Sequence, residues 1–226
     1  MKTQPNIKIS RIVLFAAVLS VIPLGLSGQN ETKKLYPQLL FPEFSSGIIK
    51  MKSGKTSTAS LNYNTVEEEM LFEQNAQFYV VSKMDEIDTV IINGRKFVPV
   101  EKAFYEVIVK GNISIYVENR NRFAPVGTKT AYGLTSQTNG PTSINTVRRG
   151  GQMRTLDIPE NVEISEAILF WVKVNGIMSK FTTERQFAKI FPGEEDKIKD
   201  FFKKSKIDIK TAEGLKMLGK FCNEEL

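Results

Sequence analysis

The chain has 226 residues, with 31 Lys and Arg against 25 Asp and Glu, one Cys and no His. The missing imidazole excludes Ser-His-Asp and Cys-His nucleophile pairs and His-ligated metal sites. The single Cys excludes an intrachain disulfide, a Cys-rich zinc site and an iron–sulfur cluster. The apolar share of 41% is ordinary for a globular protein. We therefore expect a folded protein that uses no cofactor and no metal.

Residues 1–28 have the pattern of a secretory signal peptide. Three basic residues come before an apolar run over residues 12–26, and the small pair Ser27-Gly28 follows it. Residues 1–28 contain no acid. The run is shorter than the roughly 20 residues that a membrane-spanning helix needs, although an uncleaved anchor helix is the alternative. Cleavage before Gln29 lowers the formal charge from +6 to +3, which gives no argument for nucleic-acid binding. We expect an exported mature chain without a transmembrane helix, in the periplasm or associated with the outer membrane.

The body of the mature chain, residues 29–181, is predicted to be rich in β-strands. A proline-containing lead-in over residues 29–46 precedes alternating apolar segments that are separated by turn residues. Asn93-Gly94 and Asn175-Gly176 are hairpin signals, Gly111-Asn112 suits a type II′ turn, and Pro99 favours an edge position for its strand. The predicted strands cover residues 47–52, 56–63, 77–81, 90–92, 96–100, 104–109, 113–117, 167–174 and 177–181.

Residues 127–156 form a long segment rich in Gly, Thr, Ser and Asn within this β-rich body. Its three arginines are followed by an acid only at Asp157. One interpretation is a solvated connection. The other is a basic contact loop for an anionic partner, because Arg and aromatic side chains contribute disproportionately to binding. The candidate binding residues are Tyr132, Arg148, Arg149 and Arg154.

The tail over residues 182–226 changes to a helical period. Thr183 and Thr211 are candidate N-caps, and a second helix is predicted over residues 194–204, with acids at its start and lysines at its end. Cys222 falls on an apolar helical stripe, which indicates a buried small hydrophobe, with an intermolecular disulfide as the alternative. Strands followed by helices predict an α+β fold, in which an antiparallel sheet or sandwich carries a three-helix tail packed on it.

Carboxylates are the remaining candidates for catalysis. Runs of acids at residues 67–69 and 194–196 are typical of solvated faces or helix starts. Glu106 lies in an apolar strand, where burial would raise its pKa unless it is paired; an edge-facing or salt-bridged Glu is the simpler interpretation. We single out no catalytic residue.

Several short sequences fit the exported interpretation. Asp88-Thr89-Val90 matches a pattern on which some exported bacterial proteins carry O-linked sugar. The chain resembles a family of exported proteins of unassigned function from the Bacteroidota. The resemblance lies in this segment and in Leu61-Asn62-Tyr63-Asn64, Phe104-Tyr105-Glu106-Val107 and Ile190-Phe191-Pro192. The resemblance implies a Gram-negative envelope setting and no particular chemistry.

These features together predict a non-catalytic envelope protein that binds a partner protein or a surface ligand. An accessory subunit of an outer-membrane assembly is one form of this function, with another envelope protein as partner. The alternative is a carboxylate-based glycan hydrolase, which requires two buried or perturbed acids that face one cleft.

Overall fold

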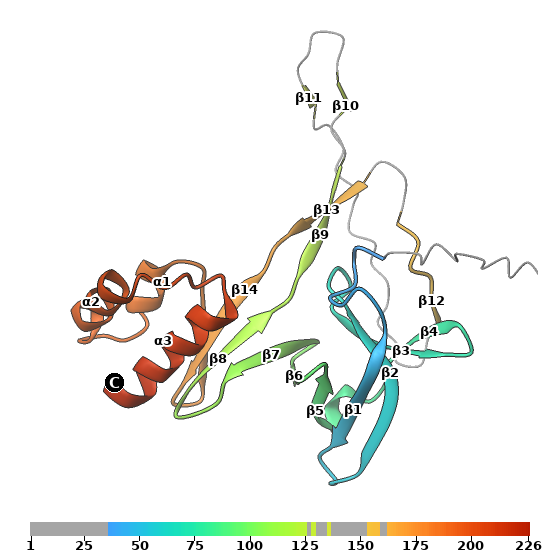
Figure 1. Cartoon of the computed structure of the whole chain (residues 1–226), viewed down its shortest axis with the longest axis horizontal. Coiled ribbons are helices and arrows are strands. Elements are labelled where there is room, and N and C mark those ends of the chain that lie inside the picture. Colours follow the sequence, from blue (N-terminus) through green and yellow to red (C-terminus); the bar gives the residue numbers. More distant parts are fainter. Residues whose placement is uncertain (1–35, 126–127, 130–134, 137–152, 159–161) are drawn as a thin grey trace, which may run out of the picture. The chain divides into compact units, whose positions relative to one another are not determined.

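The computed structural model describes residues 36–125, 128–129, 135–136, 153–158 and 162–226 (Figure 1). Its elements are β1 (Ser45–Met51), β2 (Thr56–Asn64), β3 (Glu69–Gln74), β4 (Gln77–Val80), the 3-10 helix η1 (Met84–Glu86), β5 (Ile87–Ile92), β6 (Arg95–Val100), β7 (Ala103–Val109), β8 (Ile113–Glu118), β9 (Asn121–Pro125), β10 (Thr128–Lys129), β11 (Thr135–Ser136), β12 (Met153–Arg154), β13 (Val162–Glu166), β14 (Leu169–Val174), β15 (Ile177–Phe181), α1 (Glu184–Ala188), α2 (Glu195–Ser205) and α3 (Ala212–Glu225).

Eleven of the described strands form one antiparallel sheet. Its order is β12-β4-β3-β2-β1-β5-β6-β7-β8-β14-β15, so most neighbours in the sheet are also neighbours in the sequence. β9 pairs with β13, and β10 pairs with β11, in two separate two-stranded sheets. The α+β prediction, with a large antiparallel sheet and three C-terminal helices, is confirmed.

Two hairpins form at the predicted Asn-Gly turns. Asn93 and Gly94 have φ of 49° and 76°, and Asn175 and Gly176 have φ of 49° and 84°. These left-handed conformations match the right-handed twist of the flanking strands, which is why Asn and Gly are preferred in such turns. The local sequence therefore determines the β5–β6 and β14–β15 pairings.

Two expectations about the β6–β8 region are wrong. Pro99 was expected near an edge, but β6 lies between β5 and β7. The strand tolerates it because pairing with β5 ends at Phe97, while the two-residue turn after Val100 directs the Pro99 nitrogen away from β7. Gly111 does not have the positive φ that a type II′ turn requires.

Gly111 is instead placed against the side chain of Asn223, where an added Cβ would clash with the amide group. Asn223, on α3, accepts a hydrogen bond from the Ile113 N–H at 3.0 Å and donates to the Ile113 carbonyl at 2.7 Å. One amide side chain thus satisfies both backbone groups of the first β8 residue. This contact fixes the last turn of α3 to the β7–β8 connection.

The predicted helical caps are present. The Thr183 hydroxyl accepts a hydrogen bond from the Gln186 N–H at the start of α1, and the Thr211 hydroxyl accepts one from Gly214 at the start of α3. α2 begins at Glu195, with lysines in its last turn. Helices and β8, β14 and β15 bury one apolar cluster, which contains Phe170, Val172, Phe181, Phe187, Ile198, Phe202, Leu215, Leu218 and Cys222.

A second apolar cluster belongs to the first half of the sheet. Phe41 of the lead-in packs with strands β1–β3 and β5–β7, and the buried members include Leu61, Tyr63, Met70, Ile92, Phe97 and Phe104. The two clusters lie on different parts of one continuous sheet. Among the helices that the structure describes, none is long and apolar enough to span a membrane.

Candidate functional site

The structure describes one of the four predicted binding residues. Tyr132, Arg148 and Arg149 lie outside the described residues. Arg154, on the short strand β12, donates to both oxygens of Glu69, from Nε at 2.8 Å and from Nη2 at 2.7 Å. The two side chains are 12% and 3% exposed, so this is a nearly buried ion pair. The hydrogen bonds with Glu69 raise the pKa of Arg154.

Glu106 is buried and salt-bridged, which is the simpler of the two interpretations. Its oxygens accept from Arg95 Nε at 2.6 Å and Nη2 at 2.5 Å, and Asn119 donates to it at 3.1 Å. The guanidinium also lies over the rings of Phe41 and Phe97. All of its described partners are structural, so Glu106 is not a candidate for catalysis.

The candidate site is a cleft of about 860 Å³, which we call the β3–β7 cleft. Its walls come from the start of β3, the segment between β4 and β5 that contains η1, and the β6–β7 turn. The apolar lining consists of Met70, Val80, Val81, Met84, Val100, Ala103 and Phe104. The polar and charged lining consists of Glu68, Glu69, Ser82, Lys83, Asp85, Glu101, Lys102, Tyr105 and Glu118. Nine of the sixteen lining residues are polar or charged, so the cleft is more polar than a usual small-molecule site, which is mainly apolar with a few polar groups.

Three lining residues adopt the left-handed conformation although they carry side chains. Glu68, Lys83 and Glu101 have φ of 56°, 54° and 50°. Each such residue costs of order 1 kcal/mol, and such residues cluster at functional sites because the surrounding structure holds them in place. The three positions belong to three different connections, and the other five described non-Gly residues with positive φ lie outside the cleft lining.

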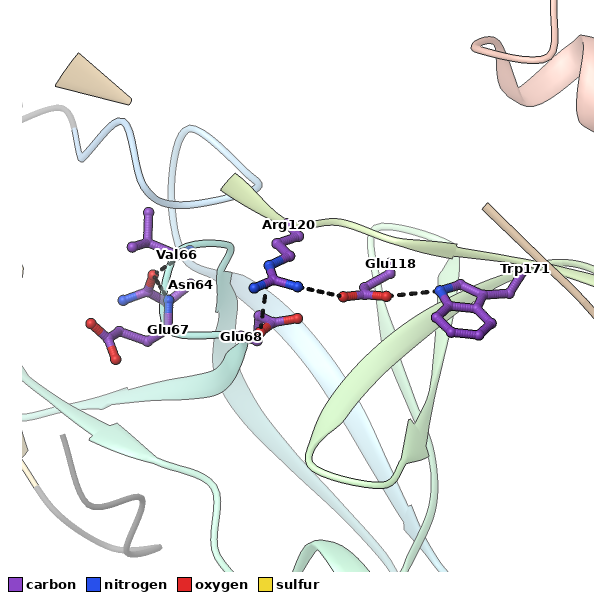
Figure 2. A network of polar contacts seen from close by, with 7 residues as sticks. All are labelled: Asn64, Val66, Glu67, Glu68, Glu118, Arg120 and Trp171. Carbon is purple, nitrogen blue, oxygen red and sulfur yellow. Dashed lines mark hydrogen bonds and ion pairs between the residues drawn. The ribbon is translucent and has the colours of Figure 1, made fainter. Parts of the chain in front are cut away.

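The connection that carries Glu68 is held by an asparagine side chain. Asn64 Oδ1, at the end of β2, accepts hydrogen bonds from the backbone N–H groups of Val66 at 3.0 Å and Glu67 at 3.1 Å (Figure 2). This arrangement stabilises the tight turn between β2 and β3. The turn presents Glu68 and Glu69 at the start of β3, at the edge of the cleft.

A row of polar contacts links two lining residues, Glu68 and Glu118, with Arg120 and Trp171 (Figure 2). Glu118, which is buried, accepts a hydrogen bond from Trp171 Nε1 at 2.7 Å through one oxygen and pairs with Arg120 at 3.6 Å through the other. Arg120 also lies 4.0 Å from Glu68. Glu118 is thus held by a short hydrogen bond from another strand, while the contacts of Arg120 with Glu118 and Glu68 are longer ion pairs.

An aromatic pair adjoins this row. Tyr105 lines the cleft and stacks on Trp171, with ring centroids 5.6 Å apart and an interplanar angle of 26°. Burial raises the pKa of Tyr105, and the neighbouring charges of Glu118, Glu68 and Glu101 act in the same direction. The Tyr105 hydroxyl therefore lies where several negative charges converge.

Sequence reasoning missed most of this site. The acids at residues 67–69 were expected on a solvated face, but Glu69 is only 4% exposed. Its partner Arg154 lies 85 residues away in the sequence, so no local pattern could indicate the pair. The available signal was Trp171, the only Trp of the chain, in the most apolar predicted strand.

Comparisons with known protein families, with curated proteins and with solved structures find no match for this chain.

Proposed function

We propose that this protein is an exported, non-catalytic cell-envelope protein that binds a partner protein or a surface ligand through the β3–β7 cleft. The observation that carries the proposal is the cleft itself, about 860 Å³ in volume, which is lined by apolar side chains together with buried and exposed charged groups. An accessory role in an outer-membrane assembly would be one form of this function.

Export is supported by the sequence of residues 1–28. The cationic start, the short apolar run and the small residues after it are the three parts of a signal peptide. The resemblance to exported Bacteroidota proteins points to the same compartment. The mature protein would begin near Gln29.

Binding is supported by the rigidity of the cleft. Glu69 is fixed by Arg154, and Glu118 is fixed by Trp171 and Arg120. Sites whose side chains are positioned in advance bind better, because less conformational entropy is lost on association.

One observation favours the alternative function, a carboxylate-based glycan hydrolase. Glu69 and Glu118 are both 4% exposed and both line the same cleft. A hydrolase needs one carboxyl group to donate a proton and a second to act as base or nucleophile. The described oxygens of these two residues are instead occupied by Arg154, Trp171 and Arg120, which suits fixed charges better than proton transfer.

A crosslinking pull-down from intact envelopes tests the proposal. The variant Asp85→Lys with Glu101→Lys reverses two exposed charges at the cleft rim, and Asp200→Lys with Glu163→Lys reverses two exposed charges outside the cleft lining. We expect one stoichiometric partner with the wild type and the control variant, and a clear loss with the cleft variant. Equal capture by all three proteins would rule out the cleft. Release of sugar from envelope glycans by the purified monomer, abolished in Glu118→Gln, would favour the hydrolase.

A further inference from the structure

We infer that the β3–β7 cleft binds a cationic, amphipathic segment of a partner protein, in which a Lys or Arg side chain lies beside an apolar one. The inference rests on the proposed function and specifies the chemistry of the partner. Its basis is the combination, in one cleft, of excess negative charge, apolar side chains and the ring of Tyr105, which stacks on Trp171.

The charge at the cleft is opposite in sign to that of the chain. Within the part of the chain that the structure describes, the lining residues and their ion-pair partners include six carboxylates and four cations: Glu68, Glu69, Asp85, Glu86, Glu101 and Glu118 against Lys83, Lys102, Arg120 and Arg154. Residues 29–226 carry a formal charge of +3. A cationic segment is thus attracted to the cleft and repelled by much of the remaining surface.

The location of these charges favours a cation near the aromatic pair. The charges of Glu118, Glu68 and Glu101 all act on the Tyr105 hydroxyl. Tyr105 stacks on Trp171, and the faces of such rings attract Lys and Arg side chains. A guanidinium or ammonium group beside Tyr105 would meet its ring and the exposed carboxylate of Glu101, whereas Glu118 is already paired with Arg120.

The apolar side chains in the cleft lining are the reason for expecting an apolar side chain beside the cation of the ligand. Met70, Val80 and Phe104 are buried members of the lining, and Val81 and Met84 are half-buried beside them. Methionine side chains adapt to irregular apolar partners. A purely polar cation would leave the accessible parts of Val81 and Met84 exposed to water, whereas an amphipathic segment covers them.

Trp171 provides a direct readout because it is the only Trp in the protein. We would titrate the mature protein with acetyl-Leu-Lys-Val-Arg-Leu-amide and follow Trp fluorescence. A matched peptide with both basic residues replaced by Gln isolates the contribution of charge. We expect saturable binding of the cationic peptide, weakening as salt is added, and at least tenfold weaker binding of the Gln peptide.

The variants used in the pull-down complete the test. Asp85→Lys with Glu101→Lys should weaken the cationic peptide about tenfold, since two exposed charge contacts become repulsive, while Asp200→Lys with Glu163→Lys should leave binding unchanged. Equal affinity for the cationic and Gln peptides would overturn the inference, as would saturable binding of chitohexaose in place of the peptides. If no peptide binds but envelope capture still depends on the cleft, only the partner chemistry is refuted. If capture is also independent of the cleft, the proposed function fails as well.

Discussion

The Glu69–Arg154 ion pair allows the sharpest prediction of stability. Replacing Arg154 by Met removes both charge-assisted hydrogen bonds and leaves a carboxylate that is 3% exposed without its guanidinium. Removing one partner of a buried pair costs about 3–5 kcal/mol. Arg154 is itself 12% exposed and lies on the edge strand β12, so we expect the lower end, about 3 kcal/mol. For a domain of this size, that corresponds to a fall in Tm of roughly 6–12 °C.

Urea denaturation followed by Trp171 fluorescence measures this effect. The double variant Glu69→Leu with Arg154→Met is expected to lose much less than the sum of the two single variants, because no unpaired charge remains buried. A change below about 0.5 kcal/mol for Arg154→Met would refute the reasoning, since that is the range of ordinary surface substitutions. If stability were unchanged while partner capture was lost, Arg154 would be a binding contact, as the sequence had indicated.

Three further side chains and the basic segment give additional predictions. Asn223→Leu should destabilise the fold by about 2 kcal/mol in urea denaturation, because both backbone groups of Ile113 lose their partner. Unchanged stability would refute a stabilising role for these two hydrogen bonds. Because the pKa of Tyr105 is raised in the folded protein, its contribution to the free energy of unfolding is fully present below about pH 10 and is lost as the pH rises further. Tyr105→Phe should therefore reduce the fall of the unfolding free energy between pH 9 and 12, measured by urea denaturation. Burial raises the pKa of Cys222 to about 12, so its thiol should react with Ellman's reagent only after unfolding, and rapid labelling of the native protein would contradict its burial. Arg148→Ala with Arg149→Ala is expected to weaken partner capture at unchanged Tm, and unchanged capture would remove the segment from the account.

The parts of the fold that could be predicted are those decided by neighbouring residues. The Asn93-Gly94 turn and the Thr183 and Thr211 caps follow from the conformations and hydrogen bonds that these residue types favour. Gly111 shows the limit, because its role is set by the close approach of Asn223 from the other end of the chain. A local turn rule cannot anticipate such a contact.

The site was less predictable than the fold for the same reason. Glu118 and its donor Trp171 are 53 residues apart, and nothing in either neighbourhood indicates the other. The acidic run at residues 67–69 has the composition of a solvated surface, yet Glu69 is buried by pairing across the sheet edge with β12. Charged residues of this kind can be recognised as parts of one site only when the pairing of distant strands is known.

The most direct measurement of the central claim is photo-crosslinking in living cells, with a photoreactive amino acid in place of Ser82. This exposed residue lines the β3–β7 cleft, whereas Asp200 on α2 is an exposed control position outside its lining. We predict an adduct from position 82 that combines one envelope partner with a mature chain beginning near Gln29, and no such adduct from position 200. An intact N-terminus on cytosolic protein, or the same adducts from both positions, would contradict the account.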